Sequence, residues 1–375
     1  MNRVLVAVAG AGKTHRIASE IAESRCRDRV LVLTFTVRNQ LEDASRIALA
    51  EKKKANQPCV MGWMSFLLNE IVRPYLPLKY PDVELRGLGI DPPTFQYLRG
   101  GKRYFSTDGD AYPGTLAKLA VDVTKASENA PIKRLELLYD AIYIDEAQDL
   151  RGNDLDIITA LFRSRINVTV VLDPRQSVLA TTKHDTKNKP YRGVKALDFY
   201  RKLEDQKLCV VENLNETHRF VPEIAAFSDF VIDGHGNFPE TVSRVKGKAN
   251  HQGIFVISKN RVKEYAERYN ATILRWNKSS GSYQGLPVAN FGECKGMQCD
   301  HVVIIATKPF VDFLVKGTPL SEESACKFYV AATRARYSVA IAVEDAKSVF
   351  TAISQFSSTL CDTCSSGTCR MDIQP

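Results

Sequence analysis

Short apolar runs rich in β-branched residues alternate with stretches of helical spacing through the first half of the chain. Buried strands of a parallel sheet are predicted at residues 4–8, 30–36, 141–144 and 168–172. Helices are predicted at residues 14–24, 37–50 and 116–127. This alternation is typical of an α/β layer in which helices cover a mostly parallel sheet.

The second half of the chain repeats the pattern. Strands are predicted at residues 253–257, 272–274, 302–306 and 339–343, with helical stretches between them. Residues 75–106 are instead rich in proline, glycine and aromatic residues, which indicates an insertion rather than core. The lysine-rich residues 181–191 are predicted to form a loop.

These patterns predict two α/β domains, and 375 residues are enough for two cores. We expect a first domain over residues 1–210, with a small insertion at about 75–135, and a second over residues 211–360. The tail, residues 361–375, contains Cys361, Cys364 and Cys369. Three thiolates are one ligand short of a structural zinc site, so a flexible tail is expected and metal binding stays open.

Composition narrows the class of protein. Hydrophobic residues make up 44% of the chain and charged residues 25%, as in globular proteins. No apolar run approaches the ~20 residues of a membrane span, and no signal-type segment precedes the first strand, so we expect a cytoplasmic protein. The net charge of +8 favours a polyanionic partner.

A phosphate-binding loop follows the first predicted strand. In residues 9–14, Ala-Gly-Ala-Gly-Lys-Thr, small residues let backbone N–H groups surround phosphate oxygens. Lys13 supplies a positive charge, Thr14 is suited to Mg²⁺, and the next helix points its N-terminus at the anion. Ala7 stands where the strict motif has its first glycine. The alternative is a Gly/Ala-rich turn before a helix.

Polar residues follow two other predicted strands. Ligands of open α/β sheets bind outside the carboxyl ends of strands, where Asp145 and Glu146 lie after one strand and Gln176 after the next. Asp145 is suited to hold Mg²⁺, and Glu146 to orient or deprotonate an attacking water. The amide of Gln176 is suited to sense a γ-phosphate. Helix N-capping is the alternative for these segments.

The second half supplies arginines. Arg219 precedes a predicted helix and Arg334 precedes a predicted strand. Phosphoryl transfer requires positive charge at the developing oxyanion, which an arginine of a second domain often supplies. A surface ion pair is the alternative for each.

Taken in order, these motifs resemble those of the UvrD/Rep/PcrA branch of superfamily 1 helicases. The matching segments are residues 9–14, 34–36, 145–149, 173–177, 218–219, 295–297 and 333–335. The resemblance implies two RecA-like P-loop NTPase domains, ATP in the cleft between them, and single-stranded DNA across their top. Residues 62–66 and 70–74 resemble compact UvrD-like ATPases of anti-phage loci, such as the Gabija helicase subunit.

By matching position, the resemblance implies a site for ATP and Mg²⁺. It makes Lys13 a phosphate ligand, Thr14 and Asp145 metal ligands, and Glu146 the catalytic base. Gln176, Arg219 and Arg334 would sense the γ-phosphate. The other nucleotide contacts fall on Ala9, Gly10, Ala11 and Gly12, on His15 and His218 beside the adenine, and on Gly296 and Gln298, the latter at a ribose-binding position. Each histidine has a plain polar role as its alternative.

The same resemblance implies a surface for single-stranded DNA. The matching positions are Phe35, Thr36, Trp63, Ser65 and Arg192. Flat aromatic faces stack bases of any sequence, while a basic surface follows the backbone. A core position is the alternative for Phe35 and Trp63.

Three departures from the family pattern qualify this expectation. The chain starts at the first strand, without the glutamine motif by which relatives read adenine, so nucleotide preference stays open. Residues 178–180 and the lysine-rich loop replace two aromatic residues that grip DNA. The segment between Arg219 and Lys295 is too short for the large accessory subdomain of the second domain.

These features predict a DNA-stimulated ATPase and single-strand translocase or helicase whose unwinding is weak or depends on a partner. The alternative is a nucleotide-gated, DNA-sensing module that regulates an associated nuclease. An RNA-directed motor is a third reading, less favoured by the resemblance. No membrane partner is expected.

Overall fold

The chain folds into two compact units. The computed structural model describes residues 1–23, 28–35, 57–95, 97–178, 187–246, 249–283, 285–346 and 349. The first unit comprises Met1–Ala7, Gly12–Pro174 and Leu179–Asn213, and the second comprises Val8–Ala11, Arg175–Val178 and Leu214–Pro375. Two short segments, one in the phosphate loop and one after a strand of the first unit, are therefore grouped with the second unit.

Some of the expected features lie outside the described residues. They are the helix over residues 37–50, Thr36, and the cysteines Cys361, Cys364 and Cys369.

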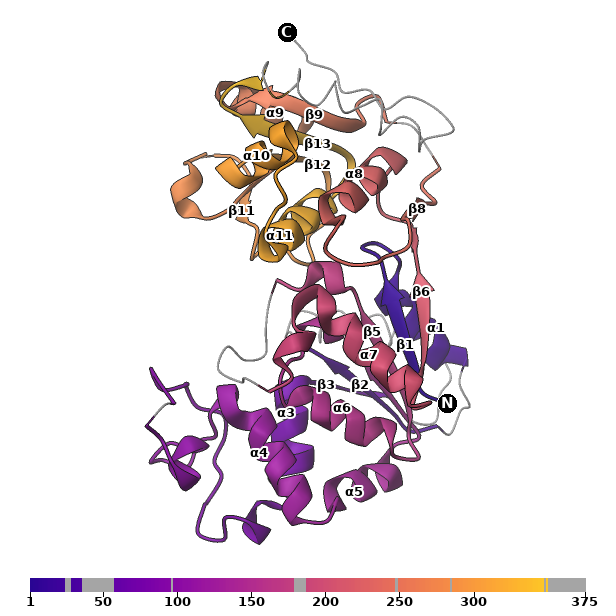
Figure 1. The fold of residues 1–375 in the computed structure, drawn as a ribbon, viewed down its shortest axis with the longest axis vertical. Coiled ribbons are helices and arrows are strands. Elements are labelled where there is room, and N and C mark those ends of the chain that lie inside the picture. The colour runs from indigo at the N-terminus through magenta and orange to yellow at the C-terminus, as the bar shows by residue number, and fades with distance from the viewer. Residues whose placement is uncertain are drawn as a thin grey trace. The chain divides into compact units, whose positions relative to one another are not determined.

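A six-stranded sheet forms the centre of the first unit (Figure 1). Its strand order is β3-β2-β4-β5-β1-β6. The strands are β1 (Arg3–Ala7), β2 (Val30–Thr34), β3 (Cys59–Gly62), β4 (Ala141–Ile144), β5 (Asn167–Leu172) and β6 (Val210–Leu214). The pairings from β3 through β2, β4 and β5 to β1 are parallel. Such strands read as continuous apolar runs because both faces are covered.

Strand β5 lies between β1 and β4. Val170 on β5 is paired with Val4 on one side and with Ile144 on the other. Because the three strands are parallel and in this register, the segments that follow them leave the sheet at the same edge. Asp145 and Asp173 are the first residues after β4 and β5.

Helices of the first unit are α1 (Lys13–Glu23), α3 (Trp63–Phe66), α4 (Pro113–Ala126), α5 (Ala130–Leu138), α6 (Asp154–Phe162) and α7 (Ala196–Asp205). Helix α3 continues directly into a π-helix, η1 (Leu67–Val72). Helix α4 buries Leu116, Leu119, Ala120 and Val123, which share one face at helical spacing, and it packs against η1. The expected insertion therefore has a helical part of its own.

The second unit is built around a five-stranded sheet of order β11-β10-β12-β13-β9, and its four pairings are parallel. Its strands are β9 (Gly253–Ser258), β10 (Thr272–Arg275), β11 (Val288–Asn290), β12 (Cys299–Ile305) and β13 (Ala335–Val343). β7 (Glu216–Thr217) pairs with β8 (Val242–Ser243). The helices are α8 (Pro222–Ile232), α9 (Val262–Tyr269), α10 (Lys308–Lys316) and α11 (Glu322–Ala332). The predicted α/β class with parallel sheets is confirmed.

One partly buried titratable group packs against aromatic rings of the second unit. The His251 ring stacks between Phe255, at a centroid distance of 4.1 Å, and Tyr269, at 3.8 Å. Burial, the neighbouring His301 and the charge of Arg268 lower the pKa of His251 to about 4. The ring is therefore neutral at physiological pH.

The described helices are all shorter than the ~20 residues of a membrane span. Within the described part of the chain, none is both long and apolar enough to cross a bilayer.

Candidate functional site

The phosphate loop has the backbone geometry that its glycines predict. Gly10 and Gly12 adopt φ values of +76° and +72°, a region that residues with a Cβ rarely enter. The Gly12 carbonyl accepts the first hydrogen bond of α1, from the Arg16 N–H at 2.8 Å. Helix α1 begins at Lys13, so its N-terminal N–H groups and the Lys13 charge belong to the same turn.

Thr14 and Asp145 meet within the first unit. The Thr14 hydroxyl donates to Asp145 Oδ2 at 3.2 Å, although the two residues are 131 positions apart. Asp145 is 3% exposed, and its backbone N–H donates to the Leu33 carbonyl at the end of β2. Burial and the repulsion of Glu146 raise the pKa of Asp145 to about 6, while the Lys13 charge and the Thr14 hydrogen bond oppose this shift.

These two residues fit a divalent metal ion. A hydroxyl and a carboxylate are oxygen ligands of the kind that Mg²⁺ takes, and a buried carboxylate with a raised pKa gains from a neighbouring cation. The described residues contain no cluster of three or more His, Cys, Asp or Glu that could hold a metal. This donor set therefore suits a cation that is also bound by phosphate and water rather than one enclosed by protein.

Glu146 is held in an uncommon backbone conformation. Its φ of 55° and ψ of 37° lie in the left-handed region. Its N–H donates to Asp145 Oδ1 at 2.8 Å, and its carboxylate accepts a hydrogen bond from the Gln148 side chain. Residues in sparsely populated conformations cluster at functional sites.

Gln148 is a residue of this site that the sequence analysis did not single out. It is fully buried, and its Oε1 accepts from the Asp173 N–H at 3.1 Å while its Nε2 donates to Glu146. It thereby ties the segment after β4 to the segment after β5. Its place two residues after Glu146 and directly before another acid was the available signal.

The second unit brings together Gln176 and the two predicted arginines. Arg334 is 1% exposed, and its Nη2 donates to Gln176 Oε1 at 3.2 Å. The Arg334 guanidinium also donates to the Val330 carbonyl at 2.9 Å, the Met297 carbonyl at 3.4 Å and the Thr333 hydroxyl at 3.3 Å. Arg219 Nη1 donates to the Thr333 carbonyl at 3.3 Å. Both guanidinium groups therefore converge on Thr333.

The start of the phosphate loop packs closely within the same unit. The His218 N–H donates to the Gly10 carbonyl at 3.0 Å, and a Cβ on Gly10 would lie 2.5 Å from the Cβ of Arg219. The Ala9 N–H donates to the Tyr329 hydroxyl at 3.2 Å. The Arg175 guanidinium lies 5.3 Å from the centroid of the same Tyr329 ring. Tyr329 thus links two segments that sequence analysis treated separately.

The residues expected at the base and sugar are mostly exposed. The side chains of His15, His218 and Gln298 are exposed, and Gly296 is exposed with a φ of +83°. The Met297 carbonyl accepts from Arg334, which fixes the turn that carries Gly296 and Gln298.

The residues expected to contact DNA differ in accessibility. Ser65 is exposed, and Phe35 and Arg192 are partly exposed. Trp63 is 1% exposed, and its indole N–H donates to Asp154 Oδ1 at 2.7 Å. Base stacking requires an accessible ring face, so this conformation favours the core role of Trp63 over a DNA contact. Thr36 lies outside the described residues.

No protein-family model matches the chain, and no curated protein sequence matches it. Among solved structures, an arterivirus nonstructural protein 10 (helicase) matches with a TM-score of 0.49 and 11% identity, covering 92% of this chain and 61% of that chain. The complex of arterivirus nonstructural protein 10 with DNA matches with a TM-score of 0.48 and 9% identity, covering 94% and 63%. The present chain spans less than two thirds of the length of either structure.

Proposed function

We propose that this chain is a helicase-type NTP hydrolase whose activity is stimulated by nucleic acid. The observation that carries the proposal is the hydrogen bond from Thr14 to the buried Asp145. It joins the helix of a phosphate loop to an acid at the carboxyl edge of a parallel sheet, the arrangement used for a phosphate-bound Mg²⁺. The left-handed Glu146 beside Asp145 adds a carboxylate held in a defined position.

Each of the site's side chains would have a separate role in NTP hydrolysis. Lys13 would neutralise the β- and γ-phosphates, and Thr14 and Asp145 would hold Mg²⁺, which supplies charge stabilisation when bound. Glu146 would orient a water molecule and accept its proton, with Gln148 restricting the carboxylate. The hydrogen bond from Arg334 to Gln176 supports a shared role for these two in sensing the γ-phosphate, and Arg219 would add positive charge.

The remaining proposed nucleotide contacts are backbone and ring positions. The N–H groups of Ala9–Gly12 would surround phosphate oxygens, with His15 and His218 beside the base and Gly296 and Gln298 near the sugar. ATP is the proposed nucleotide.

We propose single-stranded DNA as the activating polymer, on the basis of the net charge of +8 and the ordered motifs of UvrD-like superfamily 1 helicases. Phe35, Ser65 and Arg192 are the candidate contacts. The finer proposal is a translocase with weak or partner-dependent unwinding, of the compact form found with a nuclease subunit in anti-phage defence.

The test is an NTPase assay of the full chain with single-stranded DNA, duplex DNA, RNA or no polymer, across the four nucleotides. We expect stimulation by single-stranded DNA. Glu146→Gln should retain nucleotide binding and lose turnover by at least about a hundredfold, because general-base catalysis contributes about 10²–10⁴. Asp198→Asn, which removes an exposed carboxylate on α7, should leave turnover unchanged.

Two outcomes would contradict the proposal. Wild-type turnover in Glu146→Gln would remove Glu146 from the reaction. DNA binding with slow turnover that DNA does not stimulate would favour the nucleotide-gated sensing module instead of a motor.

A further inference from the structure

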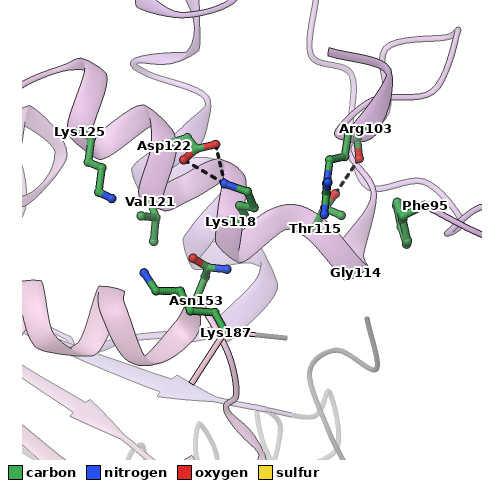
Figure 2. A pocket seen from close by; sticks show the side chains of 10 residues that line it. All are labelled: Phe95, Arg103, Gly114, Thr115, Lys118, Val121, Asp122, Lys125, Asn153 and Lys187. Carbon is green, nitrogen blue, oxygen red and sulfur yellow. Dashed lines mark hydrogen bonds and ion pairs between the residues drawn. The ribbon is translucent and has the colours of Figure 1, made fainter. Parts of the chain in front are cut away.

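Positively charged side chains line a pocket of about 310 Å³ beside α4, but they do not converge on one point (Figure 2). Arg103 lies at the start of the helix, where its carbonyl accepts from the Thr115 hydroxyl, and Lys125 lies near the end of the helix. Lys118, between them, is already paired with a carboxylate of the same helix. Groups from distant segments do converge at Tyr329 in the second unit.

The side chain of Tyr329 is bonded to the phosphate loop. Its hydroxyl accepts from the Ala9 N–H at 3.2 Å, although the two residues are 320 positions apart. Both residues are fully buried. Phenylalanine would fill the same space without a polar atom, so the hydroxyl is the part of the side chain that holds the loop at Ala9.

The loop residues on either side of Ala9 are held by backbone groups instead. The Val8 N–H donates to the Leu214 carbonyl at 3.0 Å, and the Gly10 carbonyl accepts from the His218 N–H at 3.0 Å. A substitution at Tyr329 therefore removes one attachment of the loop and leaves the two beside it.

The ring of Tyr329 contacts the segment that carries Gln176. The Arg175 guanidinium lies 5.3 Å from the centroid of the Tyr329 ring and 5.0 Å from that of Phe238. Arg175 is 1% exposed, and the attraction of a cation to a ring is stronger away from water. Because Gln176 follows Arg175 directly, this packing restricts where the Gln176 amide lies.

The backbone of Tyr329 is bonded to the residue at which the two arginines meet. The Tyr329 carbonyl accepts from the Thr333 N–H at 3.0 Å and from the Thr333 hydroxyl at 2.9 Å. Arg334 Nη2 donates to that hydroxyl and Arg219 Nη1 donates to the Thr333 carbonyl, each at 3.3 Å. Tyr329 therefore contacts three of the segments proposed for phosphoryl transfer.

We propose that Tyr329 is a positioning residue, which holds the start of the phosphate loop in a fixed place relative to Gln176 and the two arginines. This inference rests on the proposed NTPase function and narrows it. The Ala9 N–H is held by Tyr329, so the backbone contacts to phosphate fall on the later residues of the loop.

The experiment compares Tyr329→Phe with the wild type in the full chain. The substitution keeps the ring beside Arg175 and removes the hydroxyl. Tyr337→Phe, which removes the hydroxyl of a partly buried tyrosine on β13, is the matched control. Steady-state ATP hydrolysis with single-stranded DNA gives kcat and KM, and the anisotropy of a fluorescent ADP gives nucleotide affinity.

We expect kcat to fall about tenfold in Tyr329→Phe, because the buried Ala9 N–H loses its acceptor and the loop shifts relative to the arginines. The affinity for ADP should stay within about twofold, because ADP lacks the γ-phosphate on which Gln176 and the arginines act. A merely structural role would not separate kcat from ADP affinity in this way. Tyr337→Phe should match the wild type in both measurements.

A double-mutant cycle with Arg219→Ala tests whether Tyr329 acts through the arginines. The loss of kcat caused by Tyr329→Phe should shrink from about tenfold to about threefold or less in the Arg219→Ala background. The same loss in both backgrounds would overturn the proposal, as would wild-type kcat in Tyr329→Phe or an equal loss in Tyr337→Phe. Tighter ADP binding by Tyr329→Phe would also overturn it, because the hydroxyl would then compete with phosphate for the Ala9 N–H. Absence of turnover in the wild type would instead refute the proposed function, and this inference with it.

Discussion

The left-handed backbone of Glu146 predicts an unusual order of stability for two variants. Glu146→Ala and Glu146→Gly remove the same side-chain hydrogen bond, but only glycine adopts this conformation without strain. Relief of strain favours glycine by about 1–2 kcal/mol. The larger entropy of unfolded glycine offsets about 0.4–1 kcal/mol of this. Glu146→Gly should therefore be more stable than Glu146→Ala by about 0.5–1 kcal/mol.

A matched pair at an ordinary helical position should give the opposite order. Arg201 is exposed within α7, so Arg201→Gly should be less stable than Arg201→Ala by about 1 kcal/mol. The sign of the glycine–alanine difference, rather than its size, therefore tests the backbone of Glu146.

The assay is urea unfolding followed by fluorescence. The chain has 2 tryptophans, so a Trp276→Phe background leaves the buried Trp63 as the reporter of the first unit. Midpoints and slopes then give the free energy of unfolding for each pair. If Glu146→Gly is less stable than Glu146→Ala by the amount measured at Arg201, the Glu146 backbone is not left-handed. The result holds whether or not Glu146 is the catalytic base.

Two further predictions concern the phosphate loop and the aromatic cluster around His251. Gly10→Ala should lower the free energy of unfolding by about 2–4 kcal/mol, because the new Cβ adds left-handed strain and would lie 2.5 Å from Arg219. Gly12→Ala should lower it only by the strain of about 1–2 kcal/mol, because its Cβ meets nothing closer than 4.0 Å. Thermal unfolding measures both changes. The pKa of His251 is 6.5 in the unfolded chain and about 4 in the folded protein, so the unfolded chain binds the proton first as the pH falls. The protein should therefore lose about 1–2 kcal/mol of stability between pH 6.5 and pH 4, after allowance for the partial exposure of the ring. Urea unfolding at pH 7.5 and pH 5 should show a smaller loss of unfolding free energy in His251→Phe than in the wild type. Equal losses in the two proteins would contradict a lowered pKa of His251.

Elements of the fold were predictable from the sequence where burial restricts the residue types that a strand can contain. Strands β1, β2, β4 and β5 were predicted because burial on both faces requires continuous apolar runs. Strand β3 (Cys59–Gly62) was not predicted: it has four partly buried residues at the edge of the sheet, so the sequence carries little pattern. The same limit applies to the π-helix η1, since hydrophobic spacing alone does not separate it from an α-helix.

The candidate site was predicted as a set of residue types, but its connections were not. Asp145 and Glu146 stand out because acids follow a buried strand, and Lys13 and Thr14 because they end a glycine-containing loop. The link from Thr14 to Asp145 spans 131 positions, and the link from Arg334 to Gln176 spans 158, so neither leaves a local signal. At Trp63 the residue type itself was ambiguous, because an aromatic residue after a strand is equally suited to a core and to a base-stacking surface.

The conformation of Glu146 adds a structural observation to the proposed role of its carboxylate. A left-handed residue other than glycine persists only where its surroundings over-determine it. Here the Glu146 N–H donates to Asp145 at 2.8 Å, its carbonyl accepts from the Asp149 N–H at 3.2 Å, and Gln148 holds its carboxylate. Glycine would occupy this turn at lower cost in folding, so stability alone does not account for a glutamate there. The proposed catalytic role, which requires a carboxylate beside Asp145, would account for it.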